Sequence, residues 1–184
     1  MPRSLLCAAV VLLGFGGAAF AAGRGNLWLD VPFVRQQKDG CGAASIAMVM
    51  QYWERQQGEM PGPNADPDRI LRALYSREGH GIYASAMVRY FEQNGYHAFA
   101  FSGEWADLGR EFAKGRPLIV ALKPGRGREL HYVVAAGVDQ ADGLVLVNDP
   151  AQRKLLKEDQ STFAHDWKAT GNWTLLAVPA GPSR

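Results

Sequence analysis

The sequence has little cysteine, no long apolar run beyond its amino terminus and almost no excess of either charge. Its 184 residues include two cysteines, too few for a domain held together by a disulfide framework. Lysine and arginine number 20 against 18 acidic residues, so no strong field favours nucleic acid or an anionic membrane as a partner. Four scattered histidines form no metal-ligand cluster, and there is no Walker-type phosphate loop. We therefore expect no nucleic-acid partner, no metal and no cofactor.

What the sequence does contain is enough apolar material for one ordinary core. Hydrophobic residues make up 47% of the chain and charged residues 21%. At this length such a composition supports a single folded domain without a metal or a disulfide, and it excludes a disordered chain. We expect one domain over residues 22–184, and we expect it to be a monomer.

The amino terminus has the layout of a secretory signal peptide. Arg3 precedes an apolar, small-residue run over residues 5–20, and Ala19 and Ala21 have the spacing of an Ala-x-Ala cleavage site. The alternative is an uncleaved anchor, but the run is short and rich in glycine for a membrane span. We predict that residues 1–21 are removed on export, leaving a periplasmic or extracellular protein with no transmembrane segment.

Removal of this segment leaves Cys41 as the one cysteine of the mature chain, because Cys7 is lost with it. An exported protein with a single unpaired thiol is unusual, since its compartment favours oxidation. Such a thiol is either buried and inert, or retained because its reactivity is useful.

The order of predicted elements indicates an α+β domain. Extended sequence comes first, then segments with helical periodicity, then short apolar runs separated by turns, which are typical of strands. Helices before an antiparallel sheet define this class. We predict an extended segment over residues 27–34, helices beginning near Cys41, Asp66-Pro67, Ala84 and Trp105, and strands over 118–122, 132–136, 144–147 and 173–178.

Cys41 lies where a loop becomes the first of these helices, which is apolar on nearly every face. The free N–H groups and the dipole at a helix start favour a thiolate there. We expect the flanking Gly40 and Gly42 to leave room for a substrate backbone. The alternative, a small buried structural cysteine, is disfavoured by this position.

A thiolate nucleophile needs a base and a group that orients the base. Among the histidines only His131 stands at the mouth of an apolar strand, and Asp149 follows the next one. If residues 139–143 are the hairpin loop, Ala141 is its centre and Asp149 lies opposite Val133. His131 and Asp149 then share one face of the sheet as diagonal neighbours. A change of one residue in the loop would separate them, so the pairing is a hypothesis.

Several other side chains have two readings each. Arg126 and Arg128 lead into His131 and either meet an acidic substrate group or, as we favour, belong to a solvated loop. His80 either lines the cleft or is an ordinary loop residue, the reading we favour. The remaining two histidines, which we expect to be structural or at the surface, are His97 and His165.

Five short segments of the sequence stand out in order. They are Val31–Gln36, Cys41-Gly42-x-Ala44, His131–Val134, Gly137–Asp139 and Asn148–Pro150. This ordered set resembles the bacteriocin-processing-type cysteine peptidases, a double-glycine leader peptidase family of the papain-like superfamily. The resemblance covers about residues 29–179, and the ordered set is specific although each motif alone would be weak.

The resemblance implies a role for four residues. Cys41 would be the nucleophile, His131 the general base and acid, and Asp149 the group that orients His131. The amide of Gln36 and the backbone N–H of Cys41 would form the oxyanion hole. In that family the glutamine stands five or six positions before the cysteine. Gln36 is five before it, and Gln37, four before it, is the weaker candidate.

The resemblance also implies the fold: a papain-like domain in which an amino-terminal buried helix carrying the cysteine packs on a carboxy-terminal antiparallel sheet carrying the histidine and aspartate. The best-known members are domains of peptide-exporting transporters and cut leaders after a Gly-Gly pair. This sequence has no transporter segment, so the resemblance supplies no substrate.

Three functions stay open at this stage. The leading hypothesis is an exported peptidase that acts on a peptide or protein by thioester chemistry. The second is an acyltransferase or amidase that uses the same residues with an amine acceptor. The third is a peptide-binding module that retains the fold without catalysis.

Overall fold

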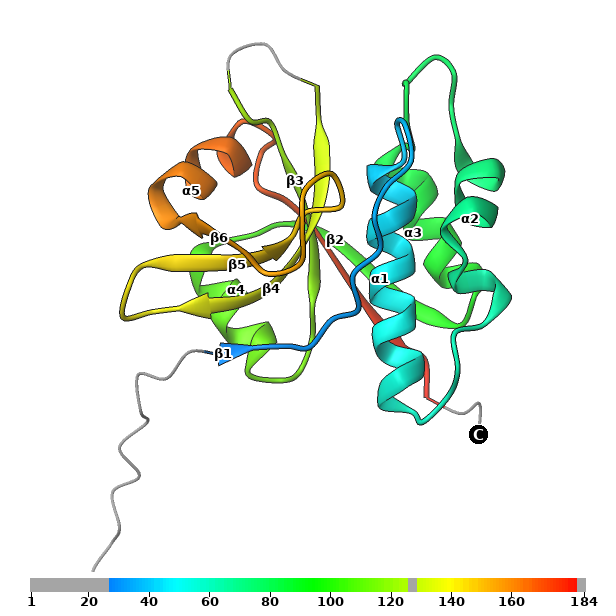
Figure 1. Ribbon diagram of the computed structural model, residues 1–184, viewed down its shortest axis with the longest axis horizontal. Helices are drawn as coiled ribbons and strands as arrows, with labels where there is room; N and C mark the ends of the chain where they lie inside the picture. The colour runs from blue at the N-terminus through cyan, green and yellow to red at the C-terminus, as the bar shows by residue number, and fades with distance from the viewer. Residues whose placement is uncertain (1–26, 126–128, 182–184) are drawn as a thin grey trace, which may run out of the picture.

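The computed structural model describes residues 27–125 and 129–181. The predicted signal peptide, Arg126 and Arg128 lie outside these residues. A seven-stranded antiparallel sheet forms the centre of the molecule, and helices pack on both of its faces (Figure 1). Within the described residues, no helix combines the length and apolar character needed to cross a membrane.

The strands of the sheet are ordered β2-β7-β3-β4-β5-β6, and β1 adds to β4. The central strands are buried on both faces, which explains why they read as continuous apolar runs. The strands are β1 (Leu27–Trp28), β2 (Tyr96–Ser102), β3 (Leu118–Leu122), β4 (His131–Asp139), β5 (Leu144–Asn148), β6 (Leu156–Asp159) and β7 (Trp173–Pro179).

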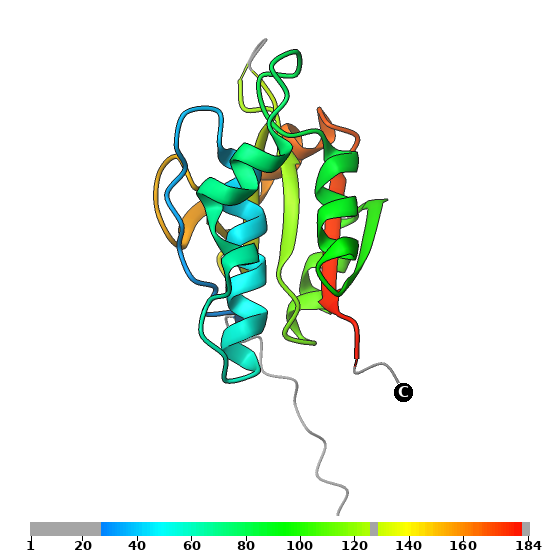
Figure 2. The same cartoon turned by 90° about the vertical axis from the view of Figure 1, so that its right-hand side faces the viewer.

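Three helices cover one face of the sheet and two cover the other. Figure 2 shows α1, α2 and α3 in front of the sheet, whereas α4 and α5 supply side chains to the core on its opposite face. The helices are α1 (Cys41–Gln56), α2 (Pro67–Leu74), α3 (Ala84–Gln93), α4 (Trp105–Phe112) and α5 (Gln160–Lys168), with a short 3-10 turn η1 (Pro63–Ala65) before α2.

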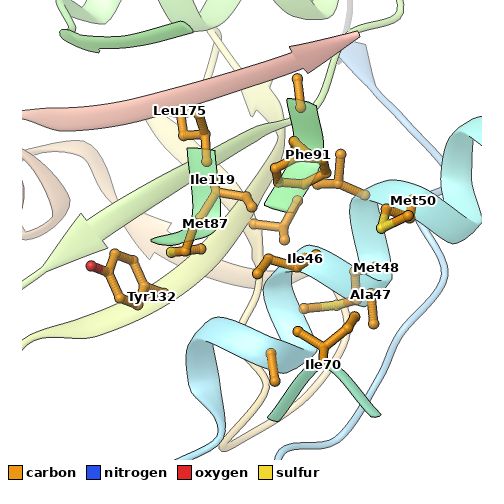
Figure 3. Close-up of a cluster of buried hydrophobic side chains, with 14 of the residues drawn as sticks. Ile46, Ala47, Met48, Met50, Ile70, Met87, Phe91, Ile119, Tyr132 and Leu175 are labelled. Atoms are coloured by element: carbon orange, nitrogen blue, oxygen red, sulfur yellow. The ribbon is translucent and has the colours of Figure 1, made fainter. Parts of the chain in front are cut away.

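The sheet separates two apolar cores because successive side chains point to opposite faces. Ile119 of β3 packs with the helices α1 to α3, whereas its neighbours Leu118 and Val120 belong to the core under α4 and α5. Ile46 of α1 is fully buried in the first core, close to Met87 and Phe91 of α3 (Figure 3). Burial of α1 fixes the position of Cys41 at its first residue.

The predicted α+β fold is confirmed, and so are the four predicted helices and the four predicted strands. The extended segment at the amino terminus is shorter than expected, because only Leu27 and Trp28 join the sheet. Four elements were not predicted, one of them the short turn η1. The edge strand β2 was missed because its side chains do not alternate cleanly between buried and exposed. The segment that contains β6 and α5 was missed because its sequence is rich in polar residues.

The hairpin between β4 and β5 differs from the prediction by one residue at its turn. Asp139 pairs with Leu144, so the turn is not centred on Ala141. A β-bulge between Ala135 and Gly137 then shifts the register, and Val134 pairs with Asn148. That pair is equidistant from Ala141, so the predicted register is correct beside His131.

Candidate active site

Cys41 begins α1 after a tight turn. The N–H of Gly40 donates to the carbonyl of Gln37 over 3.0 Å, and Asp39 takes a left-handed conformation with φ 56°. A Cβ on Gly40 would lie 3.0 Å from that same carbonyl oxygen, so a side chain there would force the turn open. The turn lets α1 begin at the thiol with its first N–H groups unpaired by any side-chain cap among the described residues.

The glycines that flank Cys41 were predicted to leave room for a substrate backbone, but the structure gives them another role. Gly42 is buried, and a Cβ there would approach the Cβ of Ile82 to 3.1 Å and the ring of Tyr132 to 3.5 Å. Gly42 therefore permits close packing beneath the thiol rather than access for a substrate. The expectation that both glycines open the site was wrong.

His131 is the first residue of β4, where it pairs with Leu122 of β3. Its Nε2 atom lies 2.8 Å from Oδ1 of Asp149, and its side chain is 20% exposed. Because Nε2 is bonded to Asp149, Nδ1 is the ring nitrogen left for another partner. Cys41 lines the same cavity as His131 and contributes to the raised pKa of the ring.

Asp149 directly follows β5, and its side chain is only 5% exposed. Oδ1 also accepts a hydrogen bond from the N–H of Ala151 over 2.8 Å, and Oδ2 accepts one from Nε2 of Gln152 over 2.6 Å. The carboxylate is thus held on both oxygens, with Oδ1 turned to His131.

The loop that carries Asp149 is joined to the segment before α1. The fully buried Asn148 donates from Nδ2 to the carbonyl of Val31 over 3.1 Å, and its Oδ1 accepts from the N–H of Leu155 over 2.9 Å. The N–H of Gln36 donates to the carbonyl of Pro150 over 3.0 Å. One network therefore places the candidate oxyanion donor relative to the aspartate.

The two candidate glutamines point in different directions. Gln36 lines the same cavity as Cys41, and its Oε1 is buried with no hydrogen-bond partner among the described residues. Gln37 is exposed and donates instead to Oδ1 of Asp68 over 2.7 Å. The arrangement therefore favours Gln36.

The thiol and the imidazole open into one cavity of about 460 Å³ at the junction of the helices and the sheet. The helical side contributes Cys41 and the loop residue His80, whereas the sheet side contributes His131. His80 thus lines the cleft, contrary to the reading favoured from the sequence. The residues that line the cavity are Gln36, Asp39, Cys41, His80, Pro124, Glu129, Leu130 and His131.

Electrostatics favours a charged imidazole beside a charged carboxylate. Burial opposes protonation of His131, but hydrogen bonds to Asp149 and Cys41, together with their charges, raise its pKa to about 9. Burial alone would raise the pKa of Asp149, but the bonds from His131, Ala151 and Gln152 and the charge of His131 hold that pKa below its ordinary value. The arrangement can hold a proton on the ring and release it to a leaving group.

Other predicted positions lie apart from this cleft. His97 and His165 are exposed, and His165 lies 3.0 Å from Asp166. Within residues 27–125 and 129–181, no three His, Cys, Asp or Glu side chains are grouped as metal ligands. Gln152, which donates to Asp149, was not among the predicted site residues, and its only signal in the sequence was an amide three residues after the candidate catalytic aspartate.

A helix that starts at a cysteine and packs on an antiparallel sheet bearing a histidine and an aspartate is the arrangement of papain-like cysteine peptidase domains. Residues 28–175 match the model of the Peptidase_C39-like family, and the chain belongs to that family. The resemblance drawn from the sequence is thereby confirmed. No curated protein matches the chain significantly.

Solved structures agree with this fold. A C39-like peptidase from Bacillus anthracis has a TM-score of 0.67 at 17% identity, covering 84% of this chain and 98% of that one. The peptidase domain of Streptococcus ComA, a bifunctional ABC transporter, has a TM-score of 0.62 at 19% identity, with 81% and 98% covered. A double-glycine-motif protease from a PCAT transporter, solved with its leader peptide, has a TM-score of 0.62 at 24% identity, with 85% and 96% covered.

Proposed function

We propose that this chain is a cysteine peptidase that hydrolyses peptide bonds with Cys41 as nucleophile. One observation carries the proposal: Cys41 and His131 line one cleft, while Nε2 of His131 lies 2.8 Å from Oδ1 of Asp149. Membership of the Peptidase_C39-like family supports the same reaction class. A nucleophile, a base and an orienting group in this geometry are what acyl transfer requires.

In the proposed reaction the thiolate of Cys41 attacks the peptide carbonyl, and the carbonyl electrons move onto oxygen. The N–H of Cys41 and the Nε2 amide of Gln36 stabilise this oxyanion. The Nδ1–H of His131 then gives its proton to the departing amine as the C–N bond breaks. A thioester remains.

Hydrolysis reverses these roles. Neutral His131 takes a proton from water, whose oxygen attacks the thioester carbon, and the Cys41 thiolate leaves as the acid is released. Asp149 stays ionised throughout and keeps the ring in the orientation that serves the thiol. The hydrogen bonds and the charge of His131 that hold the pKa of Asp149 below its ordinary value suit this constant charge.

Export is a separate part of the proposal. We infer that residues 1–21 are a signal peptide cleaved after Ala21, so that the enzyme acts in the periplasm or outside the cell. Expression of the complete chain in a secreting host, followed by mass spectrometry of the product, tests this. A mature protein that begins at Ala22 is expected, and a product that retains residues 1–21 would contradict export by cleavage.

The proposed activity is tested with a peptide library and an electrophilic peptide probe. The protein starting at Ala22 should cleave library peptides and acquire one probe molecule on Cys41, whereas Cys41→Ala should do neither. Transfer of the acyl group to added amines in preference to water would make the protein an acyltransferase. Peptide binding without labelling or cleavage would overturn the enzymatic proposal in favour of a binding module.

A further inference from the structure

The two oxygens of Asp149 have different partners. Oδ1 accepts from His131 and from the N–H of Ala151, each over 2.8 Å. Oδ2 accepts from Nε2 of Gln152 over 2.6 Å, the one donor to that oxygen among the described residues. The side chain of Asp149 is only 5% exposed, so the donors to its two oxygens stabilise a largely buried charge.

We propose that Gln152 is a positioning residue that, by donating to Oδ2, keeps Asp149 ionised and oriented toward His131. The proposal rests on the peptidase function argued above, since it assigns Gln152 a part in the same site. Gln152 touches neither the thiol nor the cleft that holds it. Its effect on catalysis therefore passes through Asp149 and His131.

Hydrogen bonds of the backbone hold Gln152 in place beside Asp149. Its N–H donates to the carbonyl of Asp149 over 2.9 Å, which closes a turn between the two residues. Its carbonyl accepts from Nη2 of Arg35 over 3.1 Å. Because two hydrogen bonds hold the backbone of the turn, the side-chain amide loses little conformational entropy when it bonds to Oδ2 of Asp149. Arg35 also connects this turn to the segment that carries Gln36, the proposed oxyanion donor.

The charges around Asp149 explain why a neutral donor matters there. A second cavity of about 280 Å³ is lined by His131, Asp149 and Gln152 together with three more acidic residues, Glu158, Asp159 and Asp166. Burial and the charges of Asp149 and Asp166 raise the pKa of Glu158. Carboxylates from β6 and α5 thus line one cavity with Asp149, and the neutral amide of Gln152 holds Oδ2 without adding another negative charge beside it.

Removal of the Gln152 amide has a defined consequence. Oδ2 loses its donor, so Asp149 binds a proton at a higher pH and rotates more freely. A protonated Asp149 no longer stabilises the imidazolium of His131. As the pH falls, the ion pair between Asp149 and His131 is then lost at a higher pH than in the wild type.

Three variants separate this role from simple loop packing. Gln152→Met keeps the length of the side chain but cannot donate, and Gln152→Lys restores a donor. Gln93→Met is the matched control, because Gln93 is an exposed glutamine at the end of α3 with no side-chain hydrogen bond among the described residues. The readout is kcat and KM for one cleaved peptide between pH 4 and 10.

For Gln152→Met we expect kcat to fall about 10–100-fold at neutral pH, with KM nearly unchanged and the acid limb of the profile moved to higher pH. Gln152→Lys should recover most of kcat and return the acid limb to the wild-type position or below it. Equal loss in both variants with an unmoved acid limb would overturn the proposal, as would wild-type behaviour of Gln152→Met. If the wild-type protein itself neither cleaves peptides nor labels at Cys41, the peptidase function has failed instead.

Discussion

Oδ1 of Asp149 lies 2.8 Å from Nε2 of His131, and this contact leaves Nδ1 as the ring nitrogen for the proposed exchange with the thiol. With Nε2 occupied, the imidazole can exchange a proton with Cys41 or a leaving amine only through Nδ1. Burial lowers the pKa of His131, and the same contact with Asp149 helps to raise it above its ordinary value. Asp149 thus contributes both to the orientation of the His131 ring and to its positive charge.

The alkaline limb of the activity profile should therefore report His131. Its pKa of about 9 means that the ring remains protonated, and able to protonate the leaving amine, until the pH approaches that value. In Asp149→Ala the bond and the charge that raise this pKa are lost while burial remains, so the alkaline limb should move to lower pH. Measurement of kcat/KM against pH checks this, and an unmoved limb would refute the assignment of Asp149.

Cys41→Ala should abolish peptide hydrolysis while the fold survives. The residue is only partly buried at the first position of α1, so loss of one sulfur atom creates little cavity. Circular dichroism and thermal unfolding should match the wild type. Turnover that persists in this variant would eliminate the thiol mechanism.

The oxyanion assignment makes a paired prediction. Loss of one such donor typically lowers kcat by about 10²–10³, and we expect this range for Gln36→Ala. Gln37→Ala should change kcat by less than about tenfold, since that side chain donates to Asp68 outside the cleft. Steady-state kinetics on one peptide measures both, and the reverse ranking would move the oxyanion donor to Gln37.

The positions of Cys41, His131 and Asp149 could be predicted because each is tied to a strong local pattern. Cys41 opens a helix that is buried almost all round, and His131 and Asp149 flank two buried strands. The register between those strands was correct only because two departures cancel. The turn is one residue off the predicted centre, and the bulge near Ala136 restores the count.

Other elements were harder to predict for physical reasons. In α5 the cap Asp159 and the buried pair Phe163 and Trp167, four residues apart, were a usable signal masked by polar neighbours. In β2 the alternation breaks where Phe99 and Ala100 are both exposed, and pairing with β7 maintains the strand. Partners such as Gln152 depend on tertiary hydrogen bonds that no periodicity encodes.

Asn148 should be a major contributor to stability at the site. In Asn148→Ala the buried carbonyl of Val31 and the N–H of Leu155 lose their side-chain partner, at a cost of about 1–3 kcal/mol in the free energy of unfolding. Activity should fall as well, because the Asp149 loop is released from the segment before α1. Asn64→Ala, at an exposed position in η1, is the control and should unfold like the wild type. Equal denaturant midpoints for both variants would contradict this role.

The last prediction concerns the charge of the resting site. Cys41 is the first residue of α1, where free N–H groups attract negative charge, and it shares a cavity with His131, whose pKa of about 9 keeps the ring protonated at neutral pH. Cys41 should therefore react with iodoacetamide at pH 6 much faster than free cysteine does. His131→Ala should remove most of this advantage, and Asp149→Ala should remove part of it, because the imidazolium then loses its carboxylate. Alkylation rates measured by mass spectrometry from pH 4 to 10 give the comparison, with His97→Ala as a control at an exposed histidine. If the alkylation rate rises only above pH 8 and is the same in His131→Ala as in the wild type, no thiolate–imidazolium pair exists.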